Sequence, residues 1–103
     1  MSQPERVCSL DELPVGKGRE FVVGGRVVAL FRTDDGVYAV DGICPHAGGP
    51  LAQGMVRNHV VTCPWHGWQY DVRTGCHTIN ARICVQSFRI NVVENDVFIE
   101  INE

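Results

Sequence analysis

Two short segments of the chain each pair one cysteine with one histidine. Cys44 and His46 are separated by one residue, and Cys63 and His66 by two. Thiolates and neutral imidazoles are both transition-metal ligands, so the two segments together can hold a metal centre. Two thiolates on one iron and two imidazoles on the other describe an asymmetric two-iron cluster. The two segments therefore suit a [2Fe–2S] site with these four residues as candidate ligands.

Two other interpretations fit the same residue types. A set of two cysteines and two histidines also binds structural zinc, but zinc fingers usually place a cysteine pair before a histidine pair. Here the order alternates. The second alternative is a buried cysteine and a surface histidine with no metal at all. A single C-x-x-H would favour that alternative, whereas two pairs argue against it.

Proline and glycine surround both ligand pairs. Pro45 and Pro64 lie inside the pairs, where a fixed φ and a missing N–H stiffen the loop. Gly48, Gly49 and Gly67 follow the pairs. Because glycine lets the backbone approach closely, these positions allow N–H groups to point at the cysteine sulfurs. Both segments are thus expected to be loops that hold a cofactor.

The elements between these loops are expected to be short strands. Apolar residues mostly alternate with a period of two, and turns recur at intervals of about eight to twelve residues, as in small antiparallel sandwiches and barrels. Gly24-Gly25 is typical of a two-residue hairpin turn. We expect a single all-β domain over residues 1–103, with strands near residues 6–8, 19–23, 26–31, 37–40, 56, 59–62, 68–72, 86–93 and 97–101.

Charge and hydropathy exclude several classes of partner. Nine Lys and Arg stand against twelve Asp and Glu, for a net charge of −3, and no basic block suggests nucleic acid. The longest apolar stretches, such as residues 27–31, are far too short to span a bilayer. The polar N-terminus lacks the apolar core of a signal peptide. We expect a cytoplasmic protein without a membrane segment.

The cysteine count gives a further expectation. Five cysteines are an odd number, which in an apparently cytosolic chain argues against a disulfide framework. Cys8 and Cys84 lie in strand-like runs and are expected to be buried, whereas Cys76 follows a turn and is expected to be an exposed thiol. His59 and His77 are expected to be surface or loop residues.

The ligand order and the stretch Cys-Pro-Trp-His-Gly-Trp resemble the two cluster-binding loops of Rieske proteins, over most of the chain. The resemblance implies layered antiparallel sheets with both loops at one tip. It also implies that Cys44 and Cys63 bind the inner iron of one [2Fe–2S] cluster, while His46 and His66 bind the outer iron near solvent.

Within that family, the chain is most similar to short Rieske ferredoxins. Respiratory members carry a disulfide between the loops, but the matching positions here are Gly49 and Trp65. Large oxygenase subunits need a second, mononuclear-iron domain. Short ferredoxins are not enzymes themselves: they pass single electrons from a flavin-dependent reductase to a terminal oxygenase. A small subunit of NAD(P)H-dependent nitrite reductase and a redox-sensing Fe–S module remain alternatives.

Two residues are expected to influence the cluster. In high-potential members a Ser and a Tyr hydroxyl donate to cluster sulfurs, and the matching positions here are Trp68 and Tyr70. Tyr70 could donate to the Cys44 sulfur or could point into solvent. Trp68 is expected in the core beneath the cluster. Without the Ser and the disulfide, the reduction potential should lie toward the low end of the range of about −150 to +300 mV.

The loops also predict a docking surface. His46, His66, Pro45, Pro50 and Trp65 are expected to form it, in a chain that acts as a monomer. A tryptophan between rigid prolines is typical of interfaces. The alternative is that Trp65 packs inward and only shields the cluster. In a third loop, relatives usually have Pro-Ala where this chain has Asn80-Ala81, so the cover over the cluster is expected to be looser or to gain a polar contact.

Overall fold

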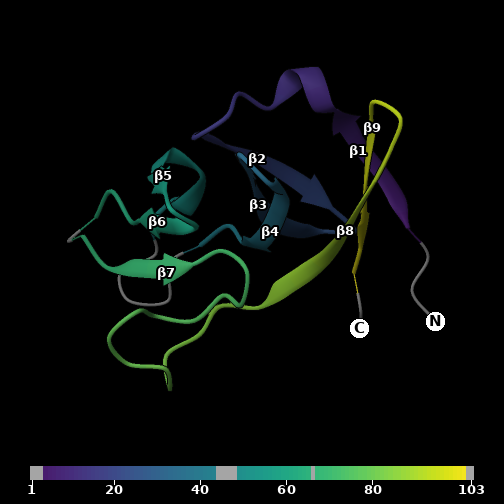
Figure 1. Ribbon diagram of the computed structural model, residues 1–103. Helices are drawn as coiled ribbons and strands as arrows, with labels where there is room; N and C mark the ends of the chain where they lie inside the picture. The colour runs from purple at the N-terminus through teal and green to yellow at the C-terminus, as the bar shows by residue number, and fades with distance from the viewer. Residues whose placement is uncertain (1–3, 44–48, 66, 102–103) are drawn as a thin grey trace.

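The computed structural model describes residues 4–43, 49–65 and 67–101 (Figure 1). Most of them belong to a six-stranded antiparallel sheet with the order β1-β9-β8-β4-β3-β2. Its strands are β1 (Glu5–Ser9), β2 (Gly18–Val23), β3 (Arg26–Thr33), β4 (Gly36–Asp41), β8 (Ser87–Val93) and β9 (Asp96–Glu100). The all-β prediction is confirmed, and the observed strands follow the expected ranges within a few residues.

A second, smaller sheet carries the functional segments. It contains β5 (Met55–Arg57), β6 (Val60–Thr62) and β7 (Gln69–Asp71), in sequential antiparallel order. Two single 3-10 turns, Leu10–Glu12 and Leu51–Gln53, complete the elements. Neither of these turns is long and apolar enough to cross a membrane, and the described part of the chain contains no other helix.

The hairpins follow from turn chemistry. Gly24 and Gly25, between β2 and β3, have φ values of 58° and 80°, as a tight turn of two left-handed residues requires. Asn58 and His59, between β5 and β6, use the same left-handed region at 51° and 66°. Asparagine and histidine tolerate this conformation better than most residues.

β3 and β4 form the middle of three layers. Val28 and Leu30 face a core shared with β1, β8 and β9, whereas Ala29 and Phe31 face a second core shared with β5–β7. Figure 1 shows β5–β7 on one side of β2–β4 and β1, β8 and β9 on the other. A strand buried on both faces needs a continuous apolar run rather than alternation, and β3 has one.

A hydrogen-bonded carboxylate links the two sheets. Asp35, in the β3–β4 turn, accepts hydrogen bonds from Thr33 at 2.6 Å and Tyr38 at 3.2 Å, and lies 3.0 Å from His59 Nε2 in the β5–β6 turn. The Thr33 hydroxyl and then His59 lower the pKa of Asp35 to about 2. His59 is a turn residue as expected, but it has a defined partner.

The expectations for the remaining cysteines were partly wrong. Cys76 and Cys84 form a disulfide, so Cys76 is not a free thiol, and Cys84 is exposed rather than buried. The odd number of cysteines did not exclude a disulfide, because a single disulfide needs only two cysteines that face each other. Cys8 is buried at 2% exposure, as expected, and burial raises the pKa of its thiol.

Candidate metal centre

The second ligand segment begins where β6 ends. Cys63 is 1% exposed and belongs to the core between the small sheet and β3–β4. Its N–H donates to the carbonyl oxygen of Trp68 at 2.7 Å, which closes the intervening loop at its base. The chain then enters β7 at Gln69. A thiol is thereby fixed at the inner side of a short closed loop, as a cluster ligand requires.

The first ligand segment is also closed at its base. Ile43 and Pro50 form an antiparallel bridge, and the N–H of Leu51 donates to the carbonyl oxygen of Gly42 at 3.0 Å. Cys44, Pro45, His46 and Gly48 lie in the segment between these anchors, outside the described residues. His66 lies outside them as well. Their roles as ligands, docking residues and supporting glycine therefore stay predictions.

Gly49 brings the two segments together. A Cβ atom on this residue would lie 2.9 Å from Trp65 Cγ and 3.1 Å from Cys63 Sγ. The end of the first segment thus packs directly against the thiol and the tryptophan of the second, which only glycine permits. This contact fits the expectation that both loops share one site. Gly67, by contrast, has a φ of 73° and open space around it, so it serves the turn.

The donor set fits an iron–sulfur cluster on these grounds. Cys63 presents a buried sulfur, and Gly49 brings backbone within contact distance of it. Among the described residues no three His, Cys, Asp or Glu side chains gather as a metal site. That result is expected, because three of the four predicted ligands are not among them.

Tyr70 lies beneath this site. It is completely buried, so the alternative in which its hydroxyl points into solvent is wrong. In the described part of the chain, no buried side-chain nitrogen or oxygen lacks a hydrogen-bond partner. Trp68 is half-buried and packs against the same core, in line with its expected place there.

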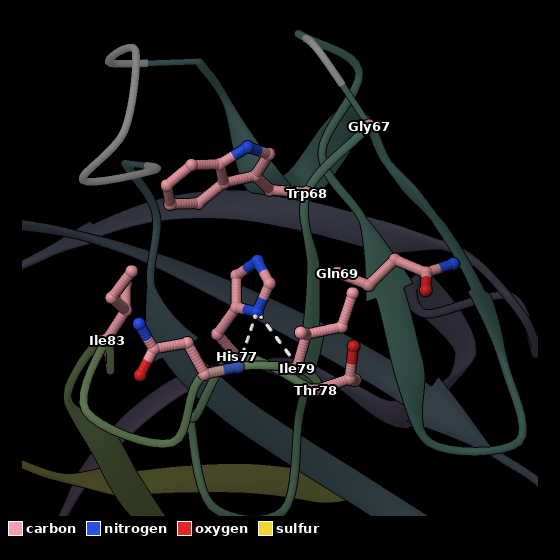
Figure 2. A pocket seen from close by; sticks show the side chains of 8 residues that line it. Gly67, Trp68, Gln69, His77, Thr78, Ile79 and Ile83 are labelled. Atoms are coloured by element: carbon pink, nitrogen blue, oxygen red, sulfur yellow. Dashed lines mark hydrogen bonds between the residues drawn. The ribbon is translucent and has the colours of Figure 1, made fainter.

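His77 is a residue whose role the sequence did not indicate. Its ring meets Trp68 and Tyr70 edge-on, with centroid distances of 4.9 and 5.5 Å. Figure 2 shows the first of these two pairs. Its Nδ1 accepts the N–H groups of Ile79 at 3.1 Å and Asn80 at 3.2 Å. No sequence pattern announces such a contact, because it depends on how the third loop folds back onto β7.

The third loop borders a pocket beside the ligand segment. The pocket, about 410 Å³ in volume, is lined by Gly67, Trp68, Gln69, His77, Thr78, Ile79, Asn80 and Ile83. Figure 2 shows the Trp68 ring next to the His77 ring, with Ile79 and Ile83 nearby. The side chain of Asn80, at the expected proline position, accepts the N–H of Arg82 at 3.1 Å. Its polar contact is therefore within the loop.

The expected docking residues that the structure describes are accessible in part. Trp65 is 50% exposed, so its ring both covers Gly49 and reaches solvent. Pro50 is half-buried. The two interpretations of Trp65, docking and shielding, are thus both compatible with its position, and an experiment has to separate them.

Comparisons with known proteins agree with this fold. The family model of the Rieske [2Fe-2S] domain matches residues 3–89. The ferredoxin component of the alkene monooxygenase system of Xanthobacter autotrophicus is 36% identical over 94 residues, which cover 90% of this chain and 77% of that protein. Several other curated relatives are much longer, and the match spans 11% to 17% of their length.

Two solved structures superimpose on nearly the whole chain. The ferredoxin of carbazole 1,9a-dioxygenase from Nocardioides aromaticivorans gives a TM-score of 0.89 at 31% identity, covering 97% of this chain and 99% of that one. A Mycobacterium tuberculosis protein assigned as an NADH-dependent nitrite reductase small subunit gives 0.92 at 25% identity, covering 100% and 98%.

The chain belongs to the Rieske [2Fe–2S] family. Its cofactor is accordingly one Rieske cluster, which when bound supplies one-electron redox chemistry. The described residues contribute a buried surface at Cys63 and Tyr70, which keeps water away from that side of the site.

Replacing Tyr70 by phenylalanine tests the expected hydroxyl donor. If the hydroxyl donates to the Cys44 sulfur, its loss should lower the midpoint potential by roughly 60 mV, equivalent to about 1.4 kcal/mol for one electron. An EPR-monitored anaerobic titration measures this shift. Tyr38→Phe is the matched control, because the Tyr38 hydroxyl donates to Asp35 instead. Equal potentials for Tyr70→Phe and wild type would show that Tyr70 is only a packing residue.

Proposed function

We propose that this chain is an electron-carrier ferredoxin that transfers single electrons from a flavin-dependent reductase to a terminal oxygenase. In this proposal Cys44, His46, Cys63 and His66 hold the cluster, and the chain is not an enzyme by itself. Two relatives support it, since they are ferredoxin components of an alkene monooxygenase and a carbazole dioxygenase. The expected monomeric state and cytoplasmic location are part of the same proposal.

The position of Trp65 carries the argument from the structure. Cys63 is buried, yet Trp65, two residues further on, is half exposed. The protein thus shields the sulfur and offers an aromatic surface within one loop. Partners that exchange electrons and separate again need a small contact of this kind. We infer that Trp65 and Pro50, with the predicted residues Pro45, His46 and His66, form the surface that docks both partners.

The second candidate function is a small subunit of an NAD(P)H-dependent nitrite reductase. The overall superposition on the Mycobacterium tuberculosis protein favours it. Such a subunit would stay bound to its enzyme, whereas an electron carrier dissociates. Gel filtration of the chain with each candidate partner therefore separates the two functions. A redox-sensing module, the third possibility, would bind a regulator in only one oxidation state.

Truncating Trp65 tests the docking surface. Trp65→Ala should lower the second-order rate constant for reduction of a ring-hydroxylating oxygenase by roughly 10-fold, the effect of losing one interface anchor. The midpoint potential should stay unchanged, because the substitution alters neither a predicted ligand nor the predicted hydroxyl donor Tyr70. Stopped-flow absorbance measures the rate, and EPR titration the potential.

Val93→Ala is the control for this experiment. Val93 is also exposed, at 57%, but it ends β8, away from β5–β7 (Figure 1). The Val93→Ala protein should transfer electrons at the wild-type rate. A changed potential in Trp65→Ala with an unchanged docking rate would favour the shielding interpretation. Wild-type protein that reduces no oxygenase, while it binds a nitrite reductase stably, would overturn the ferredoxin proposal.

A further inference from the structure

The disulfide between Cys76 and Cys84 joins the two ends of the third loop. The two residues face each other as an antiparallel bridge. Hydrogen bonds flank them on both sides, from the N–H of His77 to the carbonyl of Ile83 and from the N–H of Val85 to the carbonyl of Gly75, each at 2.8 Å. This is the non-hydrogen-bonded type of pair, in which opposing side chains are closest.

The two sulfurs differ in their surroundings from the other described cysteines. Cys84 is exposed and Cys76 is half-buried, whereas Cys8 and Cys63 are buried. Cys84 Sγ also lies 3.2 Å from the carbonyl oxygen of Ala81. In the disulfide this sulfur carries no hydrogen, so the contact becomes an S–H···O bond only after reduction. The loop thus already contains an acceptor for the reduced form.

We propose that Cys76 and Cys84 form a thiol–disulfide exchange site whose co-reactant is a dithiol. The thiolate of the dithiol attacks the exposed Cys84 sulfur, the bond between the two cysteines breaks, and Cys76 leaves as a thiolate that takes up a proton. The second thiol of the co-reactant then displaces Cys84. The dithiol gives up two electrons and two protons in total and leaves as a disulfide.

Hydrogen bonds that do not involve the two cysteine side chains also hold the loop. His77 Nδ1 accepts the amides of Ile79 and Asn80, the N–H of Ile83 donates to the Asn80 carbonyl, and the N–H of Thr78 donates to Gln69 in β7. These bonds do not depend on the disulfide. Reduction removes the covalent tie between the two ends of the loop, so the loop loosens, and the remaining hydrogen bonds keep this change local while the ligand-bearing core stays folded.

Loosening of the loop also changes the surface beside the second ligand segment. Ile79, at 88% exposure, lines the pocket that also borders Gly67, next to the predicted ligand His66 (Figure 2). A change in loop order thus alters this surface without changing a ligand. The site goes beyond the electron-carrier function, and its test needs no partner protein.

Thiol labelling of the holoprotein tests the exchange. The protein is incubated anaerobically with dithiothreitol, treated with a maleimide, and mapped by mass spectrometry. Labels should appear on Cys76 and Cys84 while Cys8 stays unlabelled and the visible absorption of the cluster is retained. Labelling of Cys76 and Cys84 only together with Cys8 would mean that reduction requires global unfolding. The disulfide would then be a permanent cross-link, and the proposal would be overturned.

Limited proteolysis tests the effect on the loop. Arg82 is exposed within the loop, and trypsin should cleave after it about 10- to 100-fold faster once the cross-link is reduced, because loop closure no longer restrains the chain. Cleavage after Arg57, exposed in β5, is the internal control and should not change. The double variant Cys76→Ser/Cys84→Ser should be cleaved fast with or without dithiothreitol. Equal rates at Arg82 in oxidised and reduced protein would contradict the proposal.

Discussion

Cys63→Ala protein is expected to contain almost no iron and to give no Rieske EPR signal. The substitution removes one of the two predicted thiolates, and the other described cysteines cannot replace it. Cys8 belongs to the opposite core, and Cys76 and Cys84 are bonded to each other. Iron analysis and EPR of the reduced protein measure the loss. Because metal binding and folding are coupled, the melting temperature should also fall.

Cys8→Ala is a matched control for this result. It removes an equally buried thiol, at 2% exposure against 1% for Cys63, from the core of the large sheet. The cluster should be retained, at a cost of about 1 kcal/mol for the lost packing. Full iron content and an unchanged spectrum in Cys63→Ala would remove Cys63 from the ligand set. Stoichiometric zinc in wild-type protein would favour the zinc interpretation instead.

Gly54→Ala should be among the most destabilising single-methyl substitutions in the chain. Gly54 lies between the second 3-10 turn and β5, with an ordinary φ of −75°. An added Cβ would overlap the carbonyl oxygen of Thr62 and lie 2.9 Å from Val61 Cγ2. Backbone cannot yield as a flexible side chain does, so we expect a loss of about 2 kcal/mol or more and a melting temperature lower by roughly 10 °C.

Gly25→Ala is the control that distinguishes steric overlap from backbone strain. Gly25 has a φ of 80° but nothing within 4 Å of an added Cβ. The substitution should therefore lower the free energy of unfolding by only about 1 kcal/mol, the penalty for a left-handed alanine. Circular dichroism melting of both holoproteins gives the comparison. If Gly54→Ala melts no lower than Gly25→Ala, the close approach of Gly54 to Thr62, the residue before Cys63, does not constrain the site.

The local chemistry of the chain explains why the strands were predictable. The Gly24-Gly25 pair marks one hairpin turn, because few other residues accept two left-handed conformations in succession. Alternating apolar residues defined the remaining strands. β3 was predictable as a strand from its apolar run, but the burial of both its faces could not be seen, because it depends on two sheets packing from opposite sides.

The site was predictable only as far as spacing determines it. The motif predicts Cys63 as a ligand, and the structure adds that its thiol is buried at the base of a closed loop. The Cys76–Cys84 cross-link was missed because it depends on the register between two irregular segments, which a count of cysteines does not contain. The contacts of His77 with Trp68 and Tyr70 were missed for a similar reason, since the loop must fold before the rings meet.

The pairing of β1 with β9 has a practical consequence for electrochemistry. Glu5 lies opposite Ile99, so the first and last strands run side by side at one edge of the large sheet. Figure 1 places that edge on the side of the molecule opposite β5–β7. A surface linker attached through either strand would orient the molecule with its redox end facing the solution. Immobilised this way on an electrode, the protein would remain open to partners while direct electron exchange with the metal surface is slow.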